Sequence, residues 1–137
     1  MLRNVSWYVF LVASIVIGLG AFGHGHSAVR VHEAIDHLPI SVQIYQTIFV
    51  VWYSVSGTML VFGAILVWIA LRLKRGDTST LFIAYVIGVY HIVLGTCALV
   101  YRNGDPFWWL FIVLGVLLVG SSSVLGMSRA GIRSDLL

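Results

Sequence analysis

Four long apolar segments without a charged side chain constrain this fold more than any other feature of the sequence. Residues 5–22, 40–71, 80–101 and 107–127 contain no Asp, Glu, Lys or Arg. A helix needs about 20 apolar residues to cross the roughly 30 Å of a bilayer core. A soluble domain with 60% hydrophobic and 9% charged residues could not cover its apolar surface. We therefore predict an all-α integral membrane protein: one domain, residues 1–137, that forms a four-transmembrane-helix bundle over these ranges.

The basic residues predict the orientation of the bundle. With four spans, both termini and the middle loop lie on one side of the membrane. That side carries six of the eight basic residues, namely Arg3, Arg72, Lys74, Arg75, Arg129 and Arg133. The positive-inside rule then predicts a bacterial inner (cytoplasmic) membrane protein with both termini cytoplasmic. The first segment has features of a signal peptide, but we expect it to be retained as a helix.

Between the first two spans lies the segment GHGHSAVRVHEAIDH, residues 23–37, with four of the five histidines. Ser27 is suited to cap a short amphipathic helix, and Pro39 is suited to end it. We therefore expect an ordered element here, facing the periplasm in a Gram-negative cell.

Four residues of this segment form a candidate metal site. Glu33 and His37 are four residues apart, so they share one face of the expected helix. His24 and His26 flank Gly25, whose flexibility could turn both imidazoles towards one ion. Imidazole and carboxylate ligands suit copper, zinc or iron. The alternative is a surface loop with local salt links.

His91 lies about ten residues from either end of the third span. Burying a polar side chain at that depth in a membrane costs free energy, so a histidine there suggests a functional site. Gly88 and Gly95 place small surface beside the imidazole, as a haem or chlorophyll-type tetrapyrrole would need, with Tyr90 nearby. A quinone is the second candidate ligand. The structural alternative is a hydrogen bond from His91 to Tyr53 or Ser54. Because His24 lies much nearer the outer boundary, we expect the two histidines not to share a haem iron.

The second span carries polar and small residues on one face, Gln43, Thr47, Ser54 and Gly57. We expect this face to point into the bundle, because small and polar residues mediate contacts between membrane helices.

The layout loosely resembles small uncharacterised four-helix bacterial inner-membrane proteins. These have Gly-His at the outer end of the first helix and a Trp-aromatic-x-x-Ser pattern in the second. The matching residues here are Gly23–His24 and Trp52–Tyr53 with Ser56. The resemblance implies a topology and a bacterial origin, and no activity.

Three functional classes remain. We favour an accessory subunit of a larger membrane assembly, respiratory, photosynthetic or oxygenase-like, which stabilises neighbouring subunits and can contact a pigment, lipid or metal. The first alternative is a redox protein in electron transport that holds a metal, tetrapyrrole or quinone at His91 or the outer histidines. A small transporter is the third class, although no carboxylate lies within a span to relay protons. The expected partners are the bilayer and other membrane subunits, not nucleic acid, and the sequence favours a non-catalytic role over an enzyme.

Overall fold

The computed structural model describes the backbone of residues 2–134 and the side chains of residues 2–127, and the regular secondary structure of this part of the chain is all helical. Its elements are α1 (Leu2–His26), α2 (Ala28–Ile35), α3 (Val42–Lys74), α4 (Leu81–Tyr101), a 3-10 turn η1 (Pro106–Trp108) and α5 (Trp109–Ser134). Four helical segments are long and apolar enough to cross a membrane. The predicted all-α class and the four long helices are confirmed; α1 extends beyond its predicted range at both ends, α3 and α5 start two residues later and end later than predicted, and α4 matches its range to within one residue.

The ends of α3 follow from local chemistry. Ser41 is the N-cap residue, and its hydroxyl accepts a hydrogen bond from the N–H of Ile44 over 3.4 Å. Gly76 follows the other end with a φ of 85°, a left-handed conformation that glycine adopts without steric cost. Next to it, the Asp77 carboxylate forms an ion pair with Arg72 and accepts the N–H of Ser79 over 2.9 Å.

The short helix α2 exists, but Ser27 does not cap it as predicted. Ser27 has helical backbone angles, and its hydroxyl donates to the carbonyl of His24 over 2.6 Å. The hydroxyl thus caps a carbonyl in the last turn of α1. Only Ser27 separates α1 from α2. It ends at Ile35, and Pro39 follows in the turn that leads to α3.

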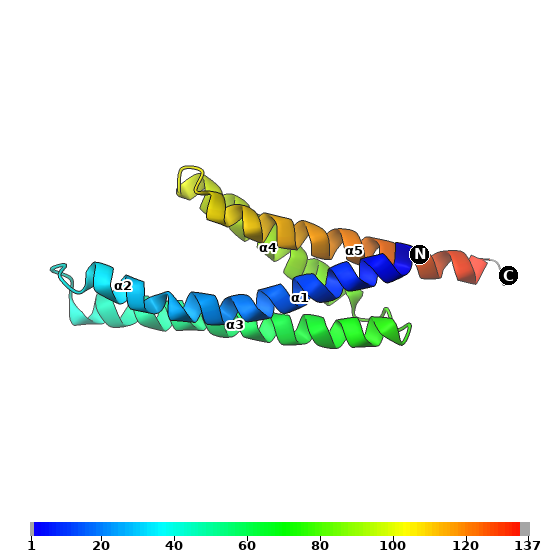
Figure 1. Ribbon diagram of the computed structural model, residues 1–137, viewed down its shortest axis with the longest axis horizontal. Helices are drawn as coiled ribbons and strands as arrows, with labels where there is room; N and C mark the ends of the chain where they lie inside the picture. Colours follow the sequence, from blue (N-terminus) through cyan, green and yellow to red (C-terminus); the bar gives the residue numbers. More distant parts are fainter. Residues whose placement is uncertain (1, 135–137) are drawn as a thin grey trace.

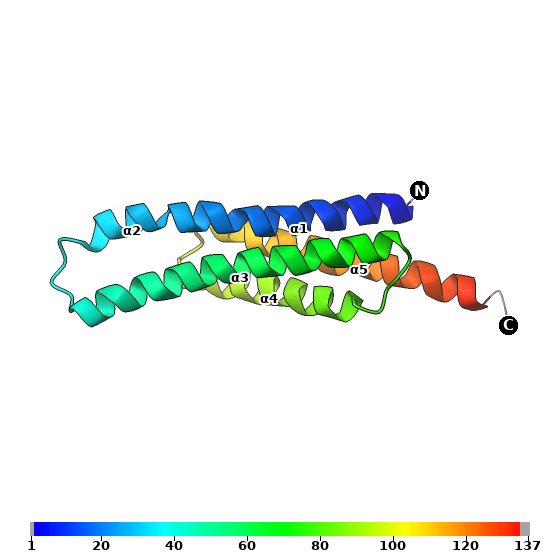
Figure 2. The same ribbon diagram turned by 90° about the horizontal axis from the view of Figure 1, so that it is seen from below.

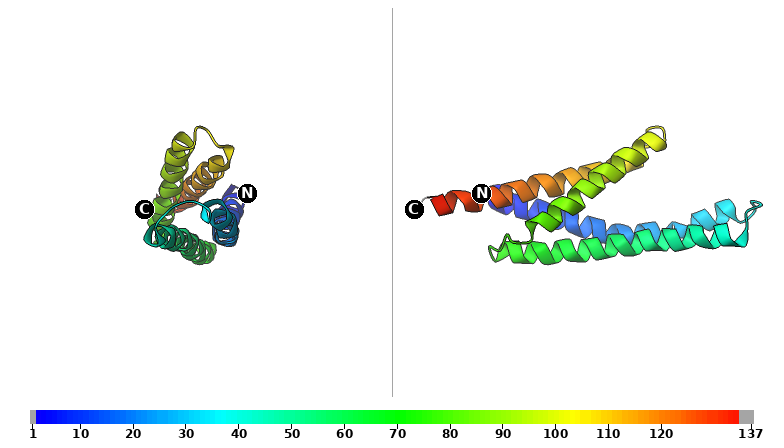
Figure 3. Two further views of the ribbon diagram at one scale, coloured as in Figure 1. Left: turned by 90° about the vertical axis from the view of Figure 1, so that its left-hand side faces the viewer. Right: turned by 180° about the vertical axis from the view of Figure 1, so that it is seen from behind.

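The helices form two antiparallel hairpins. One consists of α1 with α2 and α3, the other of α4 and α5 (Figures 1 and 2). α1 packs against both α3 and α5, whereas α3 and α4 barely touch. The start of α1, the α3–α4 loop and the end of α5 gather at one end, which we call the basic end. At the opposite end, the histidine end, the hairpins spread apart (Figures 1 and 3).

Tight packing is concentrated where the hairpins meet. Phe10, Leu66 and Leu118, from α1, α3 and α5, are completely buried in one core. A Cβ atom on Gly63 would lie 2.7 Å from the backbone nitrogen of Gly18, so α1 and α3 are in backbone contact there. Glycines at such points allow helices to approach closely. The hairpins are therefore anchored near the basic end and the middle.

The polar face of α3 does not point into the bundle as predicted. Gln43, Thr47, Ser54 and Gly57 are all exposed. Gly63, which contacts α1, follows Ser54 by nine residues and so lies on the opposite side of the helix at about 100° per residue. The hydroxyl of Thr47 bonds the carbonyl of Gln43 over 2.8 Å, and this satisfies it without a neighbouring helix.

The predicted gathering of basic residues is seen for those whose side chains are described. Arg3 lies at the start of α1, and Arg72 and Lys74 lie at the end of α3, all at the basic end. Arg129 and Arg133 lie outside the residues whose side chains are described.

Candidate functional site

His24, Trp52 and Ser56 form a polar and aromatic cluster between α1 and α3. The imidazole of His24 stacks on the indole of Trp52, with ring centroids 4.4 Å apart and an interplanar angle of 16°. Its Nδ1 lies 2.9 Å from Oγ of Ser56. Ser56 is four residues after Trp52, so both side chains lie on one face of α3. The residues that carry the resemblance in the sequence therefore lie together in space.

The same cluster closes the end of α1. Nε1–H of Trp52 donates to the backbone carbonyl of His24 over 2.8 Å. Carbonyls in the last turn of a helix have no partner within the helix and need one elsewhere. Trp52 therefore supplies a hydrogen-bond donor to a carbonyl at the end of α1 and also stacks on the imidazole. Together these contacts fix the position of His24.

His91 is buried in α4, with 2% of its surface exposed. Its Nδ1 lies 2.8 Å from the carbonyl of Ile87. A carbonyl can only accept, so Nδ1 donates, and in a neutral ring Nε2 then carries the free lone pair. The predicted structural partners were wrong, because Tyr53 and Ser54 are exposed on α3.

The space expected beside His91 for a flat macrocycle is occupied by α5. A Cβ atom on Gly88 would lie 2.8 Å from Val119, and one on Gly95 would lie 2.8 Å from Ile112. These glycines serve close packing between α4 and α5. Tyr90, the fourth residue of the predicted tetrapyrrole site, packs edge-on against Phe62 of α3 at 5.6 Å. The structure thus leaves no open face on α4 at these two glycines.

A different cavity brings His91 and His24 to one place. Where the hairpins spread apart, a cleft of about 400 Å³ lies between them. Both histidines line it, together with aromatic residues from both hairpins, which are Trp52, Phe107, Trp108 and Phe111. Gly20 and Gly23 of α1 form part of the wall. From the sequence, His24 and His91 were expected at different depths, and this shared cleft was not predicted.

Trp108 is the residue of the cleft that sequence reasoning missed. Its indole Nε1–H is buried and has no hydrogen-bond partner in the described part of the chain. Buried donors in proteins almost always have a partner. Trp108 thus brings to the cleft an indole whose donor is satisfied by no group of the described chain.

The predicted metal residues are not brought together. His24 is held by Trp52 and Ser56, while His26, Glu33 and His37 are exposed on and around α2. Within the described residues, no three His, Cys, Asp or Glu side chains form a group that could hold a metal ion. His32, which was not among the predicted ligands, makes a short hydrogen bond with the hydroxyl of Tyr45.

The histidine end also carries an apolar surface, formed by α2 and the first three turns of α3. We call this region, residues 28–53, the arm. Its exposed apolar side chains are Val29, Leu38, Val42, Ile44, Val50, Val51 and Tyr53. A groove of about 660 Å³ runs along it between α2 and α3, lined by Val29, His32, Tyr45 and Phe49 among others. Figure 1 shows that the arm extends well beyond the tip of the α4–α5 hairpin.

Comparisons with known proteins return no match: no protein-family model, no curated protein and no solved structure is significantly similar to this chain.

Proposed function

We propose that this chain is a small multi-pass membrane protein that serves as an accessory subunit, and that its arm docks on another subunit. The observation that carries the proposal is the apolar surface of the arm. α4 has 21 residues, and a helix of about 31 Å matches a bilayer core. α3 has 33 residues, so its first turns project beyond that core when both helices start from the basic end.

Because the arm lies outside the bilayer core, its exposed apolar side chains indicate a contact with another protein. Val42 is 68% exposed and Val50 is 65% exposed. In the hydrocarbon core such side chains contact lipid at no cost, but outside it they contact water. Contiguous exposed apolar surface in water marks sites of protein–protein contact. The surface of the arm is therefore suited to bind a neighbouring subunit on the outer side of the membrane.

Orientation follows from the charges at the opposite end. Arg3, Arg72 and Lys74 cluster there, and the positive-inside rule assigns that end to the cytoplasm. The arm then lies on the outer side of a bacterial inner membrane, that is, in the periplasm of a Gram-negative cell.

Site-specific photocrosslinking in native membranes tests the docking role. A photoreactive residue replaces Val50 on the arm, and a matched control replaces Val93 of α4, which is 55% exposed. We expect a discrete adduct with another protein from position 50 and lipid adducts alone from position 93. The substitution Val50→Asp should also release the chain from its complex in mild detergent, with helix content unchanged.

Two outcomes would contradict the subunit proposal. One is that position 50 gives only lipid adducts or only crosslinks between copies of this chain. The other is that the extracted protein migrates as a small particle of the same size whether or not Val50 is replaced.

The cleft between the hairpins favours a second candidate function, the binding of a lipid-soluble ligand of the quinone class. Such pockets are mostly apolar and aromatic, with a few polar groups that fix the ligand. The free Nε1–H of Trp108 suits a quinone oxygen as acceptor. Nε2 of His91 suits the hydroxyl of the reduced form as donor, because its Nδ1–H is already bound.

Fluorescence titration of the purified protein with a short-chain ubiquinone tests this candidate. Quinones quench indole fluorescence, so saturable quenching is expected, with binding weakened about tenfold by Trp108→Phe. Trp109→Phe is the control, since Trp109 is exposed and does not line the cleft. Equal affinity in the wild type, Trp108→Phe and His91→Leu would contradict quinone binding in the cleft.

A further inference from the structure

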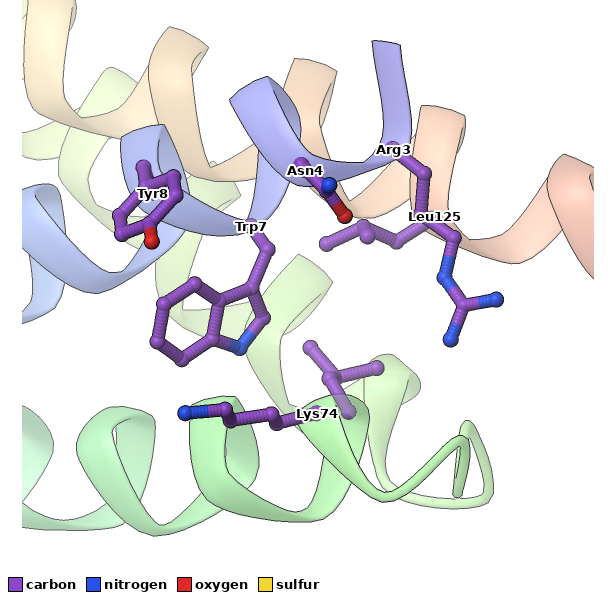
Figure 4. Close-up of a pocket in the computed structure, with 7 residues that line it drawn as sticks. Arg3, Asn4, Trp7, Tyr8, Lys74 and Leu125 are labelled. Atoms are coloured by element: carbon purple, nitrogen blue, oxygen red, sulfur yellow. The ribbon is translucent and has the colours of Figure 1, made fainter. Parts of the chain in front are cut away.

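A second cavity lies at the basic end, far from the cleft and the arm. It has a volume of about 260 Å³ and lies between α1, α3 and α5. Its walls are Arg3, Asn4, Trp7, Tyr8, Leu73, Lys74 and Leu125. Figure 4 shows Arg3 reaching down from α1 past Leu125, while Lys74 extends along α3 beneath the ring of Trp7.

Two cations from different helices therefore border one pocket. Within the described part of the chain, neither Arg3 nor Lys74 forms an ion pair, and the Asp77 carboxylate of the α3–α4 loop is bound by Arg72. The start of α1 adds the partial positive charge of a helix N-terminus beside Arg3 and Asn4. The pocket is thus bordered by Arg3 on one side, Lys74 on the other and the side-chain amide of Asn4, groups that suit an anionic headgroup.

The rest of the pocket is rigid and amphipathic. Nε1–H of Trp7 donates to the carbonyl of Ala70 over 2.7 Å, which fixes the indole between α1 and α3. The ammonium of Lys74 lies 5.3 Å from the centre of the same ring. Leu73 and Leu125 are buried and form an apolar floor. Trp7 and Tyr8 are of the type that gathers at membrane interfaces.

The surface next to the pocket is apolar and faces outward. Val12 and Ile15 follow Tyr8 by four and seven residues, so the three share one face of α1. All three are exposed. A molecule whose anionic group enters the pocket can therefore lay hydrocarbon chains along this face. The pocket is smaller than the roughly 300–1,000 Å³ of sites that enclose whole small molecules, so it suits a headgroup only.

We propose that this pocket binds the headgroup of an anionic glycerophospholipid, with Arg3 and Lys74 as cations on its two sides and Trp7 as the fixed wall. Basic pockets between membrane helices on the cytoplasmic side characteristically bind such headgroups. The proposal requires that the chain lies in a bilayer, but it does not depend on the accessory role or on a quinone.

Binding can be measured on the full-length protein in detergent micelles by native mass spectrometry. The probes are phosphatidylglycerol, phosphatidylcholine and inorganic phosphate. We expect stoichiometric retention of phosphatidylglycerol, much weaker retention of phosphatidylcholine, and no displacement of the lipid by millimolar phosphate. Arg3→Gln with Lys74→Gln should weaken phosphatidylglycerol binding about 30-fold, because each basic group near an anionic headgroup contributes about a fivefold gain.

The matched control is Arg30→Gln with Arg102→Gln, which removes the same charge at the histidine end. It should leave phosphatidylglycerol binding unchanged. All variants change exposed side chains, so helix content measured by circular dichroism should equal that of the wild type.

Three results would overturn the proposal: equal retention of phosphatidylglycerol and phosphatidylcholine, full binding by the folded Arg3→Gln/Lys74→Gln variant, or equally tight binding of inorganic phosphate. Because the isolated chain is used, the absence of a partner subunit cannot produce any of them. A chain that binds the lipid but fails to crosslink at position 50 would contradict the subunit role alone.

Discussion

Trp52 holds the last turn of α1 by a 2.8 Å hydrogen bond from its Nε1–H to the carbonyl of His24, while its indole stacks on the imidazole of the same residue. One side chain of α3 thus fixes both the backbone and the side chain of His24. The two residues are 28 positions apart, and their contact joins α1 to α3 on the wall of the cleft.

Trp52→Phe removes the hydrogen bond and keeps an aromatic ring. We expect a loss of about 1 kcal/mol in the free energy of unfolding, because the carbonyl of His24 then keeps only Ser27 as a side-chain donor. Unfolding in mixed micelles would measure it. Trp109→Phe is the control on an exposed ring and should change stability by less than about 0.5 kcal/mol. Equal effects of the two substitutions would show that the hydrogen bond adds nothing.

Gly63→Ala tests the close approach of α1 and α3. The added methyl group would lie against the backbone of Gly18, which cannot move without separating the helices. We expect a loss of about 1–3 kcal/mol, as for other overpacked sites. Gly57→Ala is the matched control on the same helix, since no atom lies within 4 Å of its added Cβ. It should be neutral or stabilise slightly, because Ala favours helix over Gly. The prediction fails if both variants melt at the same temperature.

Tyr85 and Ser123 join α4 to α5 by a 2.9 Å hydrogen bond between their hydroxyls. A double-mutant cycle with Tyr85→Phe and Ser123→Ala should give a coupling energy of about 0.6 kcal/mol, the average for side-chain hydrogen bonds between membrane helices. Ser121 bonds the carbonyl of Leu117 in its own helix. A cycle with Ser121→Ala in place of Ser123→Ala should therefore give a coupling near zero. A coupling of the same size in both cycles would refute the assignment.

Asp77 makes the stability of the α3–α4 loop depend on pH. The N–H of Ser79, together with the side chains of Ser79 and Arg72, holds the pKa of this carboxyl well below its usual value near 3.8. A lowered pKa in the folded state means that the ionised form stabilises the loop. This stabilisation is fully present above about pH 4 and is lost as the pH falls towards the folded-state pKa. We expect the difference in Tm between the wild type and Asp77→Asn to shrink between pH 5 and pH 2. A difference independent of pH would exclude this role.

Sequence reasoning worked well wherever a single helix decides the outcome. The absence of charges over about 20 residues predicts each long helix, and α2 ends before Pro39, the residue expected to terminate it, although it does so already at Ile35. The burial of His91 also follows from its place in the middle of an apolar segment.

Reasoning from one helix failed where two faces compete for the same contact. The polar face of α3 has the residue types found between membrane helices, yet the opposite face packs on α1. Gly63 meets Gly18 there with backbone contact, and this face also contains the buried Leu66. The small surface at Gly88 and Gly95 could likewise have packed against a macrocycle or against another helix. In the structure it packs against α5. A sequence does not show which of two suitable neighbours occupies a face.

The sequence by itself determined four long apolar helices, the turns between them and the segregation of basic residues to one end, because these depend on local propensity and on the free energy of apolar surface in water. Only the tertiary structure decided that the hairpins spread apart at the histidine end and that His24, His91 and Trp108 share one cleft. It also decided that Arg3 and Lys74 border one pocket. These relationships depend on contacts between residues far apart in the chain, and the geometry of helix packing, not local chemistry, selects among them.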